Sequence, residues 1–443
     1  MVMTRRQFLG VSAASMAAAV TGCATNPVTG RRQLMFVSES GEVDTDRQWA
    51  PHQFSSNYGA VQDPKLNAYL SQIGNDMAAV THRPGMPYNF RVLNMVEVNA
   101  YTFPGGSMGF ARGLMIQLED EAQLAAVMGH ELGHVNARHS SQSQTTAILT
   151  QLAVAAAAAY VEHKKGGDAA ILTAGLGGIG ANLLLSRYSR QNEREADALG
   201  MDYLVRSNYN PEGMVGVMDV FRNLFTHKPG AVELLFATHP MSDERYATAV
   251  KRVKEQYPDS GNLPRHRDRY MDHTAGLRRI KGAIEDMQKA QDMMNGGKLA
   301  EAQPILKQAL TKAPDDYAGL VLMSKCCLGL KQHAEAERYA QQAKAVYPEE
   351  AQAVFVSGQT RLAAGRFSAA LVDFEAYDKT LPGNPNTVFF QGFCHEKMGH
   401  RQQAAEAYGK YHAASPGGEH SALVQSRLVS WGYMAPPAPP AAQ

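Results

Sequence analysis

The C-terminal third of the chain repeats itself every 34 residues. Three columns of residues keep this period in phase: the prolines Pro314, Pro348, Pro382 and Pro416, the alanines Ala302, Ala336, Ala370 and Ala404, and the small residues Ala290, Ser324, Gly358 and Gly392. Three independent columns in phase are hard to obtain by chance. We therefore expect four copies of one supersecondary unit that stack on one another.

A 34-residue period with small residues and a closing proline is typical of the tetratricopeptide repeat, a pair of antiparallel helices. The expected units are Ala283–Asp316, Tyr317–Glu350, Ala351–Asn384 and Pro385–Gly418, with Leu423 to Trp431 as a capping helix. We expect an all-α solenoid over residues 273–432 and a disordered Pro/Ala tail over 433–443. Such an array exposes a concave groove that binds extended segments or partner surfaces, and the alternative is a passive spacer.

The middle of the chain holds the pentapeptide HELGH at residues 130–134. Asp120, with Gln123 three residues on, predicts the start of a helix, and apolar residues at helical spacing continue it. We therefore expect the pentapeptide to lie on a helix.

His130 and His134 are four residues apart, so on a helix they share one face and can bind one cation together. Two neutral nitrogens plus a third protein ligand suit tetrahedral Zn²⁺, one ion per chain, with one position left for water. The ion lowers the pKa of that water to about 7, and Glu131 is placed to accept its proton. This pattern predicts a hydrolytic zinc site.

The third ligand is expected in the segment Ser189–Asp197, which apolar residues at helical spacing place on another helix. Glu193 and Asp197 are again four residues apart, so Glu193 can bind the metal while Asp197 supports it. Asp197 would accept the outward N–H of a ligand histidine or form a hydrogen bond near the attacking water. Glu195 competes for the ligand role, and the alternative for the whole segment is a set of surface carboxylates.

These motifs together resemble the gluzincin zinc metallopeptidases of the HtpX and Ste24 type, over about residues 26 to 255. Asn99–Gly106 resembles the segment before the active-site helix of that family, and Asn26–Gly30 resembles the start of its periplasmic lipoprotein members. The resemblance implies that Glu193 binds the metal and that Asp197 is the supporting, catalytic aspartate. It also implies an edge strand to which an extended substrate adds, expected at Met108, Phe110, Leu114 and Ile116.

Such a peptidase with C-terminal tetratricopeptide repeats resembles the BepA type, periplasmic quality-control proteases for outer-membrane protein assembly. In that type a histidine of a His-Pro loop can approach the zinc and restrain activity. The resemblance implies this regulatory role, or that of a fourth metal ligand, for His239, and an ordinary loop histidine is the alternative. Arg245 is a candidate transition-state helper. His139 is expected to support a ligand or end the helix, not to bind metal.

The N-terminus is typical of an export signal. Arg5 and Arg6 precede the apolar run Phe8–Val20, whose 13 residues are too few to span a bilayer. The paired arginines leave the export route open between the twin-arginine and the general secretory systems.

Val20-Thr21-Gly22-Cys23 resembles a bacterial lipobox, so we expect residues 1–22 to be removed and Cys23 to be lipidated. An unmodified thiol beside an ordinary cleavage site is the alternative. A lipid anchor implies a periplasmic protein attached to a membrane. The outer membrane is favoured because Ala24, and not aspartate, follows the cysteine.

The charge balance excludes one class of partner, since 43 basic and 42 acidic side chains leave no basic field to hold nucleic acid.

Cys326, Cys327 and Cys394 lack metal-ligand spacing and are expected to be small buried residues. Two apolar runs, Ala147–Val161 and Ala169–Leu185, fall short of the roughly 20 residues that a membrane span needs. We expect them to form a helical pair beside the cleft.

The fold class expected is mostly α: an N-terminal segment over 23–60, an α+β zincin-like metallopeptidase domain over 61–260, and the solenoid. The function expected is a zinc metalloendopeptidase that cleaves misfolded or stalled envelope proteins, with repeats that recruit substrates or outer-membrane assembly machinery. The alternative is a non-proteolytic chaperone or scaffold that acts through its repeats. A scaffold would not need Glu131 beside three presumed ligands, and this chain has the full set.

Overall fold

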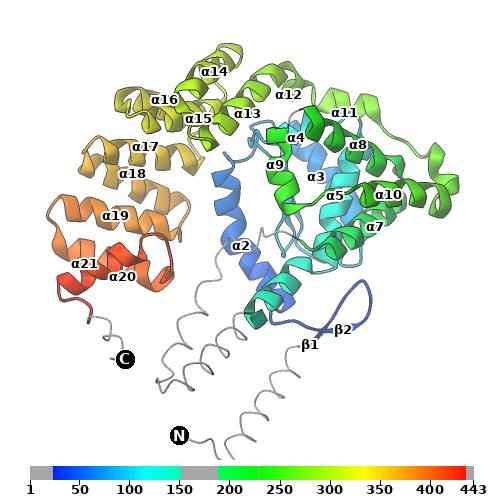
Figure 1. Ribbon diagram of the computed structural model, residues 1–443, viewed down its shortest axis with the longest axis horizontal. Helices are drawn as coiled ribbons and strands as arrows, with labels where there is room; N and C mark the ends of the chain where they lie inside the picture. The colour runs from blue at the N-terminus through cyan, green and yellow to red at the C-terminus, as the bar shows by residue number, and fades with distance from the viewer. Residues whose placement is uncertain (1–22, 151–187, 228, 436–443) are drawn as a thin grey trace, which may run out of the picture.

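The computed structural model describes residues 23–150, 188–227 and 229–435, and most of these residues are helical (Figure 1). An N-terminal part comes first, and an arc of paired helices, yellow to red in Figure 1, follows it. The expected mostly α architecture is confirmed. The signal segment 1–22, the run Ala169–Leu185 and all but the first four residues of Ala147–Val161 lie outside the described residues.

The N-terminal part opens with a small hairpin and two helices. β1 (Cys23–Thr25) pairs antiparallel with β2 (Arg32–Leu34), and α2 (Glu39–Ser56) and α3 (Pro64–Ala78) follow. Both helices begin at a capping residue, since Ser38 and Asp63 accept hydrogen bonds from backbone N–H groups of the first turn.

A three-stranded sheet follows, in the order β3-β5-β4. β3 (Asn89–Leu93) runs parallel to β5 (Ser107–Ala111), and β4 (Ala100–Thr102) pairs antiparallel with the other side of β5. β4 is therefore an edge strand of this sheet, and its residues precede β5 in the chain.

The prediction of an edge strand at Met108, Phe110, Leu114 and Ile116 is wrong. Met108 and Phe110 lie on β5, the central strand, every residue of which is buried. Leu114 lies in the short helix α4 (Arg112–Met115), and Ile116 follows that helix. The apolar alternation was misleading because a strand covered on both faces shows the same residue types as a half-covered edge strand.

The two motif helices are α5 (Glu121–Asn136) and α7 (Arg190–Arg206). α5 starts where Asp120 and Gln123 predict, and α7 contains Glu193 and Asp197 as expected. The Asp120 carboxylate accepts a hydrogen bond from the Gln123 N–H at 2.9 Å. The Ser189 hydroxyl accepts one from the Asn192 N–H at 3.1 Å. These caps satisfy donors that the first turn of a helix leaves free.

Glycines let α5 and α7 approach closely. A Cβ atom on Gly133 would lie 2.9 Å from the Ala196 carbonyl oxygen, and one on Gly129 would lie 2.8 Å from that of Gly200. Any side chain at these two positions would therefore push the helices apart. The close approach brings the histidine face of α5 within reach of the carboxylate face of α7.

Helices complete the N-terminal part. Residues 139–150 are helical, and after the motif helix α7 come α8 (Glu212–His227), α9 (Pro229–Thr238), α10 (Asp243–Gln256), the 3-10 helix η2 (Pro258–Asn262), α11 (Arg267–His273) and α12 (Ala275–Arg279). Among the helices that the structure describes, none combines the length and the apolar character that a bilayer crossing requires.

The repeats form four helix pairs and a final helix, as the 34-residue period predicts. The helices are α13 (Lys281–Asn295), α14 (Leu299–Lys312), α15 (Tyr317–Gly329), α16 (His333–Val346), α17 (Ala351–Ala363), α18 (Phe367–Thr380), α19 (Pro385–Lys397), α20 (Arg401–Ala414) and α21 (Ser421–Ser430). A Cβ atom on Gly358 would lie 2.8 Å from the ring of Phe374, and one on Gly392 would lie 2.8 Å from that of Tyr408. In these two units the small residue therefore makes room for a large ring on the partner helix. Cys326, Cys327 and Cys394 are buried free thiols.

The repeats dock on the N-terminal part through loops that join one unit to the next. The Arg112 guanidinium forms two hydrogen bonds, at 2.6 and 2.8 Å, with the carboxylate of Asp316, the residue before α15. Glu350, the equivalent residue one unit later, accepts a hydrogen bond from the Ser55 hydroxyl of α2. His52 lies 3.1 Å from the Pro382 carbonyl in the next such loop. Figure 1 shows α2 on the inner side of the arc, where it contacts α17.

Candidate metal centre

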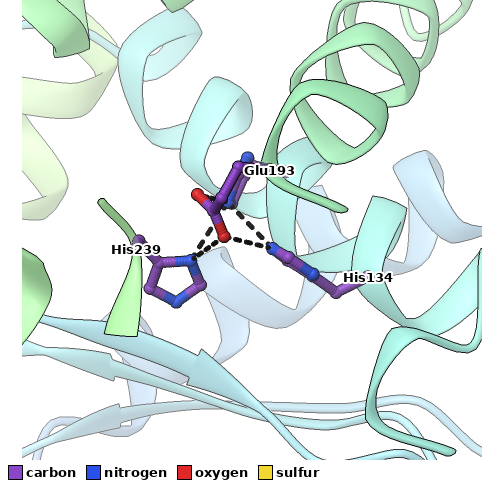
Figure 2. Close-up of side chains that lie close together, drawn as sticks. His134, Glu193 and His239 are labelled. Carbon is purple, nitrogen blue, oxygen red and sulfur yellow. Dashed lines mark hydrogen bonds and ion pairs between the residues drawn. The ribbon is translucent and has the colours of Figure 1, made fainter. Parts of the chain in front are cut away.

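Four potential ligands from three segments converge in the core of the N-terminal part. His130 and His134 come from α5, Glu193 from α7, and His239 from the turn that follows α9. All four are buried, and one nitrogen or oxygen atom of each lies within 4.8 Å of the corresponding atoms of the others. Figure 2 shows His134, Glu193 and His239 pointing toward one common point.

The separations between these atoms fit one small cation. Ligands about 2.0–2.1 Å from a tetrahedral Zn²⁺ lie about 3.4 Å from one another. Here His130 Nε2 lies 3.0 Å from His134 Nε2 and 3.3 Å from His239 Nδ1. Glu193 Oε1 lies 3.5 Å from His134 Nε2 and 3.1 Å from His239 Nδ1. The residues therefore fit a divalent metal of this size.

Contacts behind the histidines turn their lone pairs toward that point. His130 Nδ1 lies 2.9 Å from Asp197 Oδ1, so the carboxylate accepts the N–H and Nε2 is left as an acceptor. His134 Nδ1 lies 2.9 Å from His139 Nδ1, and His139 Nε2 lies 3.3 Å from Glu195 Oε2. A donor chain that ends on Glu195 leaves His134 Nε2 as an acceptor as well. The two Nε2 atoms are 3.0 Å apart, and their lone pairs repel each other unless a cation lies between them.

Glu193 and Asp197 both pair with one buried guanidinium, that of Arg245 on α10. Its Nη1 lies 2.7 Å from Glu193 Oε2, and its Nε and Nη2 donate to Asp197 at 2.6 and 2.7 Å. Burial alone would raise the pKa of Asp197, but the Arg245 charge and the His130 hydrogen bond lower it. Burial would also raise the pKa of Glu193, but the charge of His239 and its hydrogen bond to the carboxylate lower it well below its usual range. Both carboxylates are therefore kept ionised.

His134 is held in the neutral form, which can bind a metal ion. Complete burial lowers the pKa of this imidazole well below its usual value, so it stays neutral. The ring of Tyr188 stacks on that of His134 with centroids 3.8 Å apart, and the Tyr188 hydroxyl lies 2.9 Å from the Ser140 hydroxyl. Sequence reasoning missed Tyr188, because a lone tyrosine outside the motifs gives no indication of such a contact.

Glu131 lies beside the cluster but does not belong to it. Its Oε1 is 3.7 Å from His239 Nε2, and its buried Oε2 has no hydrogen-bond partner among the described residues. Burial raises the pKa of this carboxyl above its usual value, although His239 and His130 oppose the shift. A buried carboxylate with a free oxygen and a raised pKa is suited to accept a proton from bound water.

The structure thus brings together the predicted His130, His134 and Glu193, with Glu131 and Asp197 next to them. Glu195, the competing ligand, lies outside the cluster and contacts His139. Arg245 is engaged with two carboxylates, which supports a positioning role. The side chain of Cys23 is not among those described.

Comparison with known proteins identifies the N-terminal part. Residues 64–253 match the model of Peptidase family M48, and residues 294–354 match a tetratricopeptide repeat model. The chain contains a peptidase M48 domain followed by tetratricopeptide repeats. Peptidase M48 is a family of metalloendopeptidases, and a divalent metal in the His-His-Glu-His cluster agrees with that chemistry.

The relatives carry protease names. The chain is 29% identical over 202 residues to the "Beta-barrel assembly-enhancing protease" of Escherichia coli, a match that covers 45% of this chain and 41% of that protein. It is 26% identical over 293 residues to the "Putative beta-barrel assembly-enhancing protease" of Vibrio cholerae, covering 59% and 58%. It is 31% identical over 182 residues to the E. coli "Metalloprotease LoiP", covering 41% and 66%. The match thus covers less than two thirds of the length of each of these three relatives.

Proposed function

We propose that this chain is a zinc metalloendopeptidase that cleaves misfolded or stalled proteins of the bacterial envelope. The observation that carries the proposal is the convergence of His130, His134 and Glu193 around one point, with the free carboxylate oxygen of Glu131 beside them. Three neutral or anionic ligands plus a nearby base form the minimal set for metal-assisted hydrolysis.

Zinc is favoured over harder cations by the donor set. Imidazole nitrogens make up most of the cluster, whereas Mg²⁺ and Ca²⁺ prefer oxygen ligands. When bound, such an ion polarises a carbonyl and lowers the pKa of water.

Glu131 would accept the proton of the attacking water and deliver it to the leaving nitrogen. Asp197 orients His130, and Arg245 keeps Asp197 ionised and pairs with Glu193. Asp197 and Arg245 thereby position the groups that act on the substrate.

His239 is proposed to restrain the site. Its Nδ1 lies 3.1 Å from Glu193 Oε1 and 3.3 Å from His130 Nε2, in the position that an open catalytic site leaves to water or substrate. His239→Ala should therefore raise the rate of peptide cleavage. A lower rate would assign His239 to catalysis instead.

Substrate class and location are proposed from the relatives and the N-terminal sequence. Relatives named for β-barrel assembly support envelope proteins as substrates, and the repeats would recruit them or the assembly machinery. Cys23 ends the lipobox-like segment and Ala24 follows it, so the chain would be anchored in the periplasm, at the outer membrane. Cys23→Ser should move the protein from the membrane fraction to the soluble periplasm, and continued sedimentation with membranes after a high-salt wash would refute the anchor.

The decisive experiment pairs cleavage with metal content. Glu131→Gln should retain about one zinc per chain and lose cleavage of casein or a quenched peptide by about 10²–10⁴-fold, since an amide cannot accept the proton. Wild-type turnover in this variant would exclude Glu131 as the base. Absence of cleavage in the wild-type, zinc-loaded protein would favour the chaperone or scaffold alternative.

A further inference from the structure

The hairpin of β1 and β2 exposes large apolar side chains. Leu34 of β2 is 36% exposed and Phe36 is 41% exposed, whereas Met35 between them is buried. Since side chains alternate between the two sides of an extended segment, Leu34 and Phe36 share one outward side. Figure 1 shows the hairpin at the lower edge of the molecule, away from the arc of repeats.

The helix that begins at His139 continues this apolar surface. The Phe36 N–H donates a hydrogen bond to the Thr145 hydroxyl at 3.1 Å, and Leu149, one helical turn further on, is 42% exposed. Two exposed threonines of the helix donate their hydroxyls to carbonyls one turn earlier, at 2.9 and 2.8 Å: Thr146 and Thr150. Because the helix itself satisfies these hydroxyls, contact with an apolar medium would cost them little.

Unpaired positive charge flanks these apolar side chains. Arg31 and Arg32 are exposed in the hairpin, and neither forms an ion pair with another described residue. The segments 23–38 and 139–150 contain no aspartate or glutamate. An apolar surface with arginines at its margin and no acidic residue complements the boundary between acidic lipid headgroups and acyl chains. We call five side chains together the hairpin face: Arg31, Arg32, Leu34, Phe36 and Leu149.

Cys23, the proposed site of lipidation, lies beside this face. The pairing of β1 with β2 places the Cα atom of Cys23 opposite that of Leu34. Paired Cα atoms of antiparallel strands are about 4.5–5.5 Å apart. An acyl group on Cys23 would therefore hold the hairpin at the surface of the bilayer into which it inserts.

We propose that the hairpin face binds the surface of a bilayer that contains acidic phospholipids. Its three apolar side chains insert among the headgroups, and its two arginines pair with lipid phosphates. The inference rests on the proposed anchor at Cys23 and adds a second, non-covalent contact with the same membrane. An anchor on one residue leaves the protein free to rotate about it, whereas this second contact selects one orientation.

That orientation sets the height of the metal centre above the membrane. His139 contacts the ligand His134, and Leu149 lies near the far end of the helix that His139 begins. A helix rises about 1.5 Å per residue, so His139 and Leu149 are separated by about 15 Å. The metal centre would thus face chains that stall close to the membrane surface.

The test uses the mature chain, residues 23–443, with Cys23→Ser, so that no acyl group contributes to binding. At low salt this protein should bind vesicles of equal parts phosphatidylglycerol and phosphatidylcholine at least about tenfold more tightly than vesicles of phosphatidylcholine alone. Arg31→Ser/Arg32→Ser should weaken binding to the acidic vesicles by about 10–30-fold, and high salt should reduce this difference because ions screen the attraction. Equal binding to the two vesicle types, or binding to neither, would overturn the proposal.

A matched pair of double variants assigns the binding to the hairpin face. Leu34→Ser/Phe36→Ser removes two apolar side chains and should weaken binding to acidic vesicles by at least about tenfold. Leu234→Ser/Phe225→Ser removes the same two kinds of side chain, 43% and 59% exposed, from α9 and α8, and should leave binding unchanged. Circular dichroism checks that each variant is folded. An equal loss of binding in the two variants would refute the assignment.

A fluorescent probe at Leu149 tests insertion without a change in the hairpin. In the same chain, Leu149→Cys labelled with an environment-sensitive fluorophore should shift its emission to the blue when acidic vesicles are added, because the probe enters an apolar medium. Val372→Cys, at an exposed position of α18, should show no shift. The other three cysteines of this chain are buried, so the label reacts at the introduced thiol. No shift at position 149 would contradict insertion.

The vesicle tests are independent of the test of the anchor, because they use a chain without an acyl group. If Cys23 carries no lipid in cells and acidic vesicles still select the hairpin face, the anchor fails and the hairpin face stands. If Cys23 is lipidated and the chain without the acyl group ignores acidic vesicles, the hairpin face fails and the anchor stands.

Discussion

Buried charge is arranged in opposite ways at the metal centre and at the interface between the peptidase domain and the repeats. At the centre, several ligands point toward one another, and lone pairs of His130 and His134 face each other at 3.0 Å. At the interface, Arg112 and Asp316 satisfy each other through two hydrogen bonds, with side chains only 3% and 4% exposed. The first arrangement requires a cation from outside, whereas in the second two opposite charges pair with each other. A buried polar cluster can thus serve function or structure, and the direction of its lone pairs distinguishes the two.

The largest effect is expected from the removal of a converging ligand. His134→Ala should lower zinc affinity by more than about 100-fold, because even the loss of a residue that supports a ligand costs about 10–100-fold. Metal analysis after dialysis against a weak chelator measures this, with circular dichroism as the check that the fold persists. Full zinc retention in His134→Ala would show that His134 is not a metal ligand.

Breaking the interface pair should instead change stability and leave the metal unchanged. Arg112→Ala leaves the Asp316 carboxylate buried without its partner, which typically costs about 3–5 kcal/mol. Urea unfolding of the full chain measures the loss, and zinc content should stay at the wild-type level. The double variant Arg112→Leu/Asp316→Asn keeps a capping side chain before α15 and should recover most of the stability. An equal loss in the single and double variants would mean that the charge pair is not the cause.

A smaller, pH-dependent effect is expected at Lys325 of α15, whose ammonium lies 4.9 Å from the centre of the Tyr58 ring. Burial lowers the pKa of Lys325 to about 8, and the Glu97 charge only partly opposes this. Between pH 8 and about 10.5 the unfolded chain binds more protons at this residue than the folded chain does. The stability of wild type relative to Lys325→Met should therefore rise with pH in that window, by up to about 3 kcal/mol. Parallel melting-temperature profiles of the two proteins from pH 7 to 10.5 would contradict this.

The smallest effect is expected at Glu195. It contacts His139 and not the cluster, so Glu195→Gln should lower zinc affinity by no more than about tenfold. A loss as large as that of His134→Ala would move Glu195 into the set of ligands. Competitive titration with a fluorescent zinc chelator resolves the difference.

Sequence reasoning predicted the parts of this molecule that depend on helical spacing. Two histidines four residues apart on α5 and two carboxylates four residues apart on α7 define faces, and glycine at 129 and 133 lets these faces meet. The repeat period likewise predicted all four helix pairs. The domain boundaries and the roles of individual site residues stay predictions.

Other features depend on packing between distant segments, which spacing does not reveal. The order of the strands depends on how β3 and β4 flank β5, and apolar alternation does not indicate that order. The stacking of Tyr188 on His134 joins residues 54 positions apart without a common motif. The docking of the repeats uses single side chains such as Arg112 and Ser55, which look ordinary in the sequence.

The docking contacts recur with the repeat itself. Asp316 and Glu350 occupy the same position in successive units, and Pro382 lies in the next equivalent loop. The repeats thus contact the N-terminal part at regular intervals along one side, while their last helices extend beyond these contacts (Figure 1). Units could be added or lost at the far end during evolution, in whole steps of 34 residues, without disturbing a single contact near the metal centre. The length of the array could therefore change while the contacts around the metal centre stay the same.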